Sequence, residues 1–395
     1  MSGPLDGYRI LDLTAMISGP LATMLLGDQG ADVIKVEIPG TGDYVRATGN
    51  RNGGLAASFL NNNRNKRSIT IDLKTEQGRD VLMRLAKEAD VFVQNFRPGV
   101  VERMGIGEDD IRAVAPNIIY VSISGFGENG PFAAKPVYDP IIQALSGLAS
   151  VQGGSDDARP RLIRTIVPDK VTAITAAQAI TAALLSRART GEGQHVRLSM
   201  LDAILSFLWS SDMGGQTFVD KPINQQRAAS FIDLVYETKD GHMSVAVMND
   251  REWTGLTRAL DCPEWLEDER FKTPAMRDRN INERLEMTQE VLLTRTTDEW
   301  MQRLEAERVP CAPVLTRTGV LEHPQIVAND ILHVTDHPQA GPLRQARAAA
   351  RFSATPTSVR RGAPLLAEHT DEILRETGLD DAEITALRDA KVVGS

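Results

Sequence analysis

The chain has 395 residues, 42% of them hydrophobic and 25% charged, which is typical of a folded protein with more than one domain. Its formal net charge of -9 argues against a general nucleic-acid binder, because such proteins need an excess of Lys and Arg facing phosphates. Cys262 and Cys311 are the only cysteines. A single disulfide would do little to stabilise a chain of this length, so we expect free thiols in a reducing compartment.

The beginning of the chain has neither a positively charged segment nor an apolar run. We therefore expect no secretory signal and a cytoplasmic location. The most apolar helical stretch, residues 170–187, is interrupted by three Thr and one Gln. We expect a buried helix there and no membrane span.

The first 125 residues alternate between strand-like and helix-like segments. Short strands are expected at residues 8–14, 33–37, 69–73, 91–94 and 118–123. Helices are expected over residues 19–29, ending at Gly30, and from Thr75 to about Ala89. This alternation predicts a mostly parallel sheet with helices on both faces, a doubly wound, Rossmann-like α/β domain.

The second half of the chain begins with a long apolar helix, expected from about Asp169 to Arg187. A loop at residues 190–194, a strand at 195–198 and a helix from Ser199 follow it. The pattern weakens around residues 214–222, so we end the first domain at about residue 215. Residues 225–315 predict a smaller α+β domain that starts with a hairpin, and residues 316–395 form a Pro- and Gly-rich tail ending in a helix.

Two segments carry positive charge next to expected strands. Residues 61–67 form a basic, polar segment, which is either a solvated loop or a phosphate site, since Arg and Lys both suit phosphate oxygens. Residues 95–99 directly follow the strand at 91–94. Ligands of open α/β sheets bind beyond the carboxyl ends of strands, so Arg97 and Arg103 either hold an anionic group or are surface arginines without a role.

Asp169 lies at the head of the long apolar helix, directly after Pro168. A carboxylate in the first helical turn is stabilised as the anion by free N–H groups and the helix dipole. Asp169 is therefore either a plain helix cap or a nucleophile. The setting fits either role. A helix cap bonds to the free N–H groups, and a nucleophilic carboxylate must stay ionised while partly buried.

Several common sites are absent from the sequence. The six histidines show no metal-ligand spacing, so we expect no metal site. No G-x-G-x-x-G follows the first strand, which disfavours a nicotinamide or flavin cofactor at the usual place. Neither a Walker A sequence nor a G-x-S-x-G nucleophile motif occurs.

A series of short motifs runs along nearly the whole chain. They are residues 5–13, 19–20, 30–37, 65–73, 95–99, 124–127, 190–194 with Ser199 and Asp202, and 309–313. In this order and at this spacing they resemble the family III CoA-transferases, the CaiB/BaiF group. The resemblance implies an enzyme that moves coenzyme A from an acyl-CoA, such as succinyl-CoA, to a small carboxylic acid.

By this resemblance Asp169 is the catalytic residue, which forms first a mixed anhydride and then an aspartyl-CoA thioester. CoA thioester is then a substrate, and no tightly bound cofactor is expected. The matching positions of the family's CoA site are Ala15, Met16, Ile17, Ser18, Arg67, Leu73, Lys74, Asn95, Phe96, Arg97, Arg103, Met104 and Tyr138.

The resemblance also implies the assembly. Both ends of the chain, residues 1–215 and 316–395, are expected to build the large CoA-binding domain, with residues 225–315 inserted as the small domain. Two such chains are expected to form a homodimer of interlocked rings, without nucleic-acid or membrane partners.

A different branch of the family is the alternative. Its 2-methylacyl-CoA racemases carry a His where this chain has Tyr138, and a phenol with an ordinary pKa of about 10 is a poor replacement for imidazole. We therefore favour a transferase. Residues 245–251 lack the glycine run of the oxalate enzymes, and Ile17 stands where those carry Gln, so oxalate is not the expected acceptor.

Overall fold

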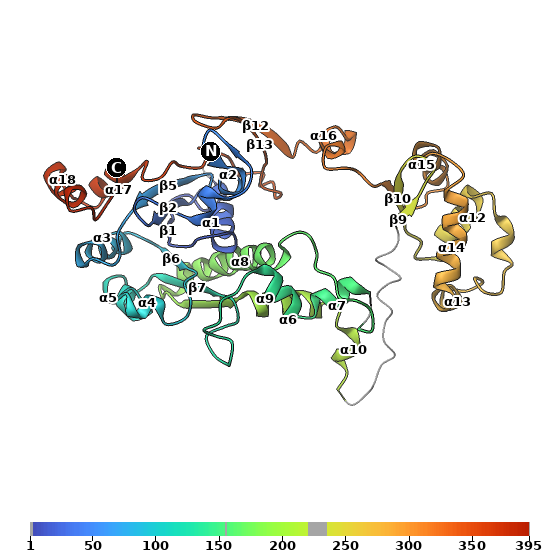
Figure 1. Cartoon of the computed structure of the whole chain (residues 1–395), viewed down its shortest axis with the longest axis horizontal. Coiled ribbons are helices and arrows are strands. Elements are labelled where there is room, and N and C mark those ends of the chain that lie inside the picture. The colour runs from blue at the N-terminus through green and yellow to red at the C-terminus, as the bar shows by residue number, and fades with distance from the viewer. Residues whose placement is uncertain (1–2, 155, 220–234, 395) are drawn as a thin grey trace. The chain divides into compact units, whose positions relative to one another are not determined.

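The computed structural model describes residues 3–154, 156–219 and 235–394, and it divides the chain into two compact units (Figure 1). The first unit combines Met1–Leu148, Leu162–Ser211 and Asn329–Ser395, so it contains both ends of the chain. The second combines Ala149–Arg161 and Asp212–Ala328.

A six-stranded parallel sheet organises the first unit. Its order is β5-β2-β1-β6-β7-β8, and every neighbouring pair is parallel. The strands are β1 (Arg9–Asp12), β2 (Asp32–Glu37), β5 (Lys66–Thr70), β6 (Val91–Gln94), β7 (Ile119–Ser124) and β8 (His195–Ser199). This confirms the predicted parallel α/β sheet, with one strand displaced: β5 begins at Lys66, three residues before the expected strand at 69–73.

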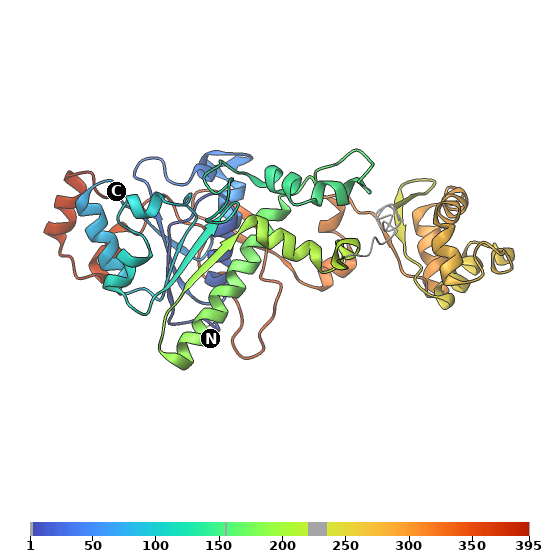
Figure 2. The ribbon, with the colours of Figure 1, turned by 90° about the horizontal axis from the view of Figure 1, so that it is seen from below.

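Helices cover both faces of this sheet (Figures 1 and 2). On one face lie α1 (Ser18–Asp28) and α8 (Val167–Thr190), and on the other lie α3 (Glu76–Lys87), α5 (Glu108–Val114), α17 (Thr370–Glu376) and α18 (Asp381–Asp389). Strand residues alternate between the two cores: Val91 and Val93 face α8, whereas Phe92 faces the other side.

Helix α8 is the long apolar helix expected from the sequence. Its small side chains Ala173, Ala176 and Ala183 are buried and pack closely on α1 and the sheet. It is also the one helix in the described part of the chain that is long and apolar enough to cross a bilayer. A core helix meets the same criterion, and the packing of α8 against the sheet is that of a core helix.

Shorter elements complete the first unit, and most of them connect the strands to the helices. They are the single-turn helix η1 (Tyr44–Ala47), β3 (Arg51–Asn52), β4 (Leu55–Ala56), α2 (Ala57–Asn62), α4 (Val100–Arg103), α6 (Asp139–Leu145), α9 (Met200–Trp209), β12 (Leu332–His337) and β13 (Gly341–Ala346). The helix α7 (Leu148–Gly153) starts at the last residue of the first segment of this unit.

A three-stranded sheet and several helices form the second unit. The expected hairpin is present: β9 (Val235–Glu237) pairs antiparallel with β10 (His242–Val245), which also pairs with β11 (Cys311–Pro313). Trp253, Phe271 and Trp300 fill its core. Its other elements are α10 (Gly214–Thr217), α12 (Asp250–Ala259), η2 (Pro263–Leu266), α13 (Pro274–Arg279), α14 (Ile281–Leu292), α15 (Thr297–Ala306), η3 (Gly319–Leu321) and α16 (Pro324–Ala328).

The basic segment at residues 61–67 is not a solvated loop, and that interpretation was wrong. Arg64, Lys66 and Arg67 are at most 5% exposed, and they pair, in that order, with Asp28, Asp12 and Asp32. Strand β5 begins at Lys66, so the end of this segment is already part of the sheet. Its three cations are therefore buried, where they contact protein carboxylates.

Lys66 lies at the centre of a buried charge network beneath α1. All three protons of its ammonium group have partners: Oδ2 of Asp12 at 2.8 Å, Oδ1 of Asn63 at 2.8 Å and the carbonyl of Pro20 at 2.9 Å. Burial lowers the pKa of Lys66 to about 8. Burial would also raise the pKa of Asp12, but the ammonium groups of Lys66 and Lys35 outweigh it and hold that pKa far below its usual value.

We expect Lys66→Met to destabilise the protein by about 3–5 kcal/mol, because it removes the cation that is paired directly with the fully buried Asp12 carboxylate. Urea denaturation followed by circular dichroism measures this. The matched control is Lys87→Met on the exposed side of α3, which should stay within about 0.5 kcal/mol of the wild type. Equal stability of the two variants would contradict the role given to the network.

Candidate active site

Asp169 is the third residue of α8, and its carboxyl group reaches the first residue of α1. Both the hydroxyl and the backbone N–H of Ser18 donate hydrogen bonds to it. Ser18 is 4% exposed, whereas Asp169 is half-buried. The structure thus brings together two predicted site residues from helices that are about 150 residues apart in the chain, at the N-terminal ends of both helices.

Asp139 holds the backbone that leads into α8. It is 3% exposed, and its Oδ2 accepts the backbone N–H of Asp169 at 3.2 Å. Its Oδ1 accepts the side-chain amide of Gln143 at 2.6 Å, and Oε1 of Gln143 accepts the N–H of Ile163 at 2.9 Å. The sequence alone left open whether the nearby Asp139 acts on Asp169, and it gave no role to Gln143. The spacing of four between Asp139 and Gln143 in a short helix was the only local signal for Gln143.

The environment of Asp169 raises its pKa to about 6. Burial is the largest cause, and the neighbouring Asp139 carboxylate adds to it, while the two hydrogen bonds from Ser18 act in the opposite direction. At pH 7 the larger part of the carboxyl groups is therefore still ionised. A carboxylate of higher pKa is a stronger nucleophile than an ordinary one, so the site suits attack on a carbonyl carbon.

The turn between β1 and α1, residues 14–18, forms the other wall of the site. The side chain of Asn95 makes two hydrogen bonds to the backbone of Ala15. Its Oδ1 accepts the N–H of Ala15 at 2.9 Å, and its Nδ2 donates to the carbonyl of Ala15 at 2.8 Å. Met16 has a φ of 71°, a left-handed conformation that is strained for a side chain of this size. Its N–H donates to Asp43 at 3.1 Å, which helps to hold the strained backbone.

The buried network reaches this turn directly. Oδ1 of Asp12 accepts the backbone N–H of Thr14 at 3.0 Å, and Nζ of Lys35 donates to the carbonyl of Thr14 at 2.8 Å. Lys35 in turn pairs with Asp43 at 3.1 Å. The position of the turn therefore depends on charges that lie beneath α1.

Apart from Ile17 in the β1–α1 turn, the remaining predicted CoA-site residues lie beyond the carboxyl ends of β5 and β6 or beside α6. Leu73, Phe96 and Met104 are partly buried against the core of α3 and α5. Lys74, Arg97 and Arg103 are exposed, and in the described ranges no ion pair engages them. Tyr138 directly precedes α6 and is 67% exposed. Ile17, half-buried, precedes Ser18.

Arg67 differs from the other predicted residues. Its guanidinium donates to Asp32 on β2 and to Glu372 and Glu376 on α17. Burial lowers its pKa, but these carboxylates outweigh burial and raise it above its usual value. The contact of Arg67 with CoA stays a prediction.

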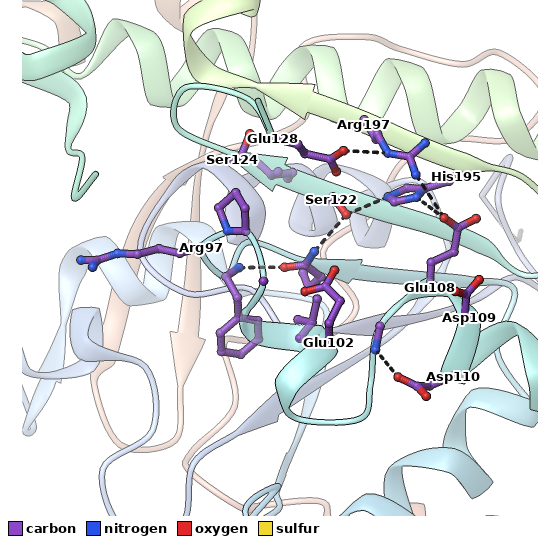
Figure 3. Close-up of a pocket in the computed structure, with 17 residues that line it drawn as sticks. Arg97, Glu102, Glu108, Asp109, Asp110, Ser122, Ser124, Glu128, His195 and Arg197 are labelled. Atoms are coloured by element: carbon purple, nitrogen blue, oxygen red, sulfur yellow. Dashed lines mark hydrogen bonds and ion pairs between the residues drawn. The ribbon is translucent and has the colours of Figure 1, made fainter. Parts of the chain in front are cut away.

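A cavity of about 530 Å³ opens beside the turn that follows β6 (Figure 3). Phe96 and Arg97 line it, together with His195, Arg197 and several carboxylates, namely Glu102, Glu108, Asp109, Asp110 and Glu128. In Figure 3, Arg97 lies on the left of the view, and His195, Arg197 and Glu108 lie on the right. Asp169 is not among its lining residues. In the parts of the chain that the structure describes, no group of three or more His, Cys, Asp and Glu has the arrangement of a metal site.

The fold and the site together define a doubly wound α/β enzyme with a candidate nucleophilic carboxylate where two helices begin. Comparison with known proteins names its family. The sequence pattern of CoA-transferase family III matches residues 5–370. A succinyl-CoA:glutarate CoA-transferase from Homo sapiens is 36% identical, over 99% of this chain and 90% of its own.

Further relatives agree. A formyl-CoA:oxalate CoA-transferase from Streptomyces coelicolor is 32% identical, over 98% of this chain and 99% of its own. The crystal structure of a CaiB/BaiF family protein from Brucella suis is 33% identical and superimposes with a TM-score of 0.83, covering 95% of this chain and 100% of that one. The chain therefore belongs to the family III CoA-transferases, as the sequence motifs indicated, and it is an enzyme of that family.

We expect Asp139→Asn to shift the acid limb of the pH–activity profile to lower pH. The wild-type limb should fall near pH 6, the pKa of Asp169, and removing the Asp139 charge lowers that pKa. The asparagine has one oxygen for two donors, the N–H of Asp169 and the amide of Gln143, so we also expect a loss of about 1–3 kcal/mol in stability. Activity and urea denaturation measure the two effects.

The matched variant is Ser18→Ala, which should move the same limb in the opposite direction. It removes a hydroxyl that donates to the Asp169 carboxylate, so the pKa of Asp169 rises and the acid limb moves to higher pH. A shift of both variants in the same direction would contradict this assignment of the two neighbours.

Proposed function

We propose that this enzyme moves coenzyme A from an acyl-CoA donor, such as succinyl-CoA, to a short dicarboxylic acid, with Asp169 as the nucleophile. The observation that carries the proposal is the setting of Asp169. It is a half-buried carboxylate of raised pKa at the head of α8, with donors from the first turn of α1 directed at it. Membership of the family supports transfer as the reaction.

In the first step an oxygen of Asp169 attacks the thioester carbonyl of the donor. The C–S bond breaks, CoA leaves as the thiolate, and an acyl-aspartyl anhydride forms. Negative charge develops on the carbonyl oxygen during this attack. The N-terminal end of α1, which begins at Ser18 beside Asp169, favours such charge through the helix dipole.

In the second step the thiolate attacks the Asp169 carbonyl of the anhydride. The donor acid leaves with the bridging oxygen, and an aspartyl-CoA thioester remains. The carboxylate of the acceptor acid then attacks this thioester, and the two steps run in reverse to give the new acyl-CoA and free Asp169. Each step needs no group beyond the two substrates and the enzyme, so no tightly bound cofactor is proposed.

The predicted CoA contacts divide by their charge. Exposed Lys74, Arg97 and Arg103 suit the phosphates, because none of them is engaged by a carboxylate in the described ranges. Apolar Leu73, Phe96 and Met104 suit the less polar parts of CoA. The remaining contacts are proposed for the turn of residues 15–18 and for Tyr138 beside α6.

The choice of a dicarboxylic acceptor rests on the relatives. Two of them, at 36% and 34% identity, are named for succinyl-CoA and glutarate. The names of others give oxalate, also a dicarboxylic acid. The racemase alternative needs an acid/base group beside the substrate. By the resemblance, Tyr138 stands at the racemases' His position; it is exposed, and a phenol is a poor replacement for imidazole in this role.

The proposal predicts that acyl transfer to the protein depends on Asp169. Incubation with succinyl-CoA and hydroxylamine should yield a modified peptide with the label at Asp169, found by mass spectrometry. Asp169→Asn should abolish the label and reduce CoA transfer by at least about 10³-fold, because an amide is no nucleophile. If no label appears while solvent deuterium enters the α-carbon of a 2-methylacyl-CoA, the enzyme is a racemase and the proposal is wrong.

We also propose that the enzyme is a cytoplasmic homodimer of interlocked rings. Large apolar side chains on the packed helices α8 and α9 support association, since they are exposed in the single chain: Ile174 and Leu185 at 61%, Phe207 at 51% and Trp209 at 50%. Light scattering should give twice the mass of one chain. A mass of one chain at micromolar concentration would contradict the dimer.

A further inference from the structure

A chain of hydrogen bonds crosses the wall of the cavity and ends at the backbone of the turn after β6 (Figure 3). Nδ1 of His195 lies 2.5 Å from Oε2 of Glu108, and its Nε2 lies 2.8 Å from Oγ of Ser122. The amide of Gln94 donates to the same Oγ at 2.9 Å. Oε1 of Gln94 accepts the backbone N–H of Phe96 at 2.8 Å. We name Glu108, His195, Ser122 and Gln94 the relay.

The relay has a single polarity. The carboxylate of Glu108 only accepts, so Nδ1 of His195 carries a proton. In the neutral ring, which we assign here, Nε2 then accepts the hydroxyl proton of Ser122. The oxygen of Ser122 then accepts the amide N–H of Gln94, which turns the amide oxygen of Gln94 toward the N–H of Phe96. Each group thus fixes the orientation of the next one.

Packing keeps the relay in place. Gln94 is 4% exposed and the side chain of His195 is 9% exposed. The ring of Tyr120 meets the ring of His195 edge-on, with centroids 5.0 Å apart. The four members come from four different elements. Gln94 is the last residue of β6, Ser122 lies within β7, and His195 and Glu108 are the first residues of β8 and α5.

The residue between Gln94 and Phe96 connects the relay to the site. This residue is Asn95, whose side chain makes both hydrogen bonds to Ala15. From Ala15 the chain runs three residues to Ser18, the donor to Asp169. The segment that the relay holds, residues 95–97, also contributes Asn95, Phe96 and Arg97 to the proposed CoA site.

We propose that the relay is a positioning device for the turn of residues 95–97, which binds CoA and fixes the wall of the Asp169 site. Its members touch no reacting atom. They act by fixing one backbone N–H and, with it, the side chain of Asn95. This inference rests on the proposed CoA contacts of residues 95–97. Burying four hydrogen-bonding side chains costs free energy, and apolar side chains could hold the strands together without that cost. The polar side chains therefore point to a role beyond packing.

The first test measures CoA binding by calorimetry in Ser122→Ala and Gln94→Met. Each breaks the relay and leaves the CoA-contacting side chains in place, and we expect CoA to bind about ten-fold more weakly. In turnover, the KM for acyl-CoA should rise while the KM for the acceptor acid stays within about two-fold. The matched control is Glu128→Gln, which lines the same cavity and pairs with Arg197 outside the relay, and should bind CoA like the wild type.

The second test reverses the polarity with Gln94→Glu. The new carboxylate accepts from both Phe96 and the hydroxyl of Ser122, so the Ser122 proton is no longer available to His195. Nε2 of His195 must then donate, and the ring is held as the imidazolium between Ser122 and Glu108. The charged neighbours Glu108 and Arg197 are unchanged in this variant. Nitrogen-15 NMR at pH 7.5 should show a neutral ring protonated at Nδ1 in the wild type and a doubly protonated ring in the variant.

The outcomes separate this inference from the proposed function. Weaker CoA binding in both relay variants, with unchanged circular dichroism, supports the positioning role even if no label is trapped at Asp169. CoA affinities within two-fold of the wild type in both variants overturn it, even if Asp169 is labelled. An unchanged protonation state of His195 in Gln94→Glu overturns the assigned polarity of the relay.

Discussion

The buried pair of Lys66 and Asp12 is the interaction on which the site depends. Both side chains are fully buried, so each must have all of its hydrogen-bonding partners, or the pair would destabilise the fold. This requirement leaves little freedom to the elements that supply the partners. Lys66 fixes the carbonyl of Pro20 in α1, and Asp12 fixes the N–H of Thr14. The β1–α1 turn is therefore held at both of its ends.

The fixed β1–α1 turn forms one wall of the site, beside the proposed nucleophile Asp169. Because the turn is fixed, Met16 tolerates a left-handed backbone and Ser18 presents its hydroxyl and N–H to Asp169. Asp139 accepts the backbone N–H of Asp169 and so holds the residue that carries this carboxyl group. Burial and Asp139 raise the pKa of Asp169, and Ser18 lowers it. The balance leaves a carboxylate that is both ionised at neutral pH and more basic than usual.

Local sequence patterns were enough to predict most of the first unit. Strands such as 91–94 were found because a short, buried β-branched run has few other interpretations, and Thr75 was found as the start of α3 because its hydroxyl caps the helix. The basic segment at 61–67 was misjudged, since its partners Asp12, Asp28 and Asp32 lie 35 to 54 residues away, and a run of charged residues does not show whether they are buried or exposed.

The site was predicted in part, and through resemblance more than through physics. The local sequence shows that Asp169 follows Pro168 at the start of an apolar helix. Its catalytic role was predicted only from the family motifs. The positions of Asp139 and Gln143 beside the start of α8, and the link from His195 through Ser122 to Gln94, depend on contacts between residues 20 to 73 positions apart. No periodicity or motif carries such contacts, so only the fold reveals them.

The most direct test of the nucleophilic role of Asp169 is the path of oxygen. In the proposed mechanism each turnover transfers one oxygen of the acceptor acid to the Asp169 carboxylate, and one oxygen of Asp169 to the released donor acid. Turnover with a dicarboxylic acceptor labelled with oxygen-18 should therefore add label to the peptide that contains Asp169 and to the succinate released from succinyl-CoA. Transfer of CoA without label in either place would contradict the account.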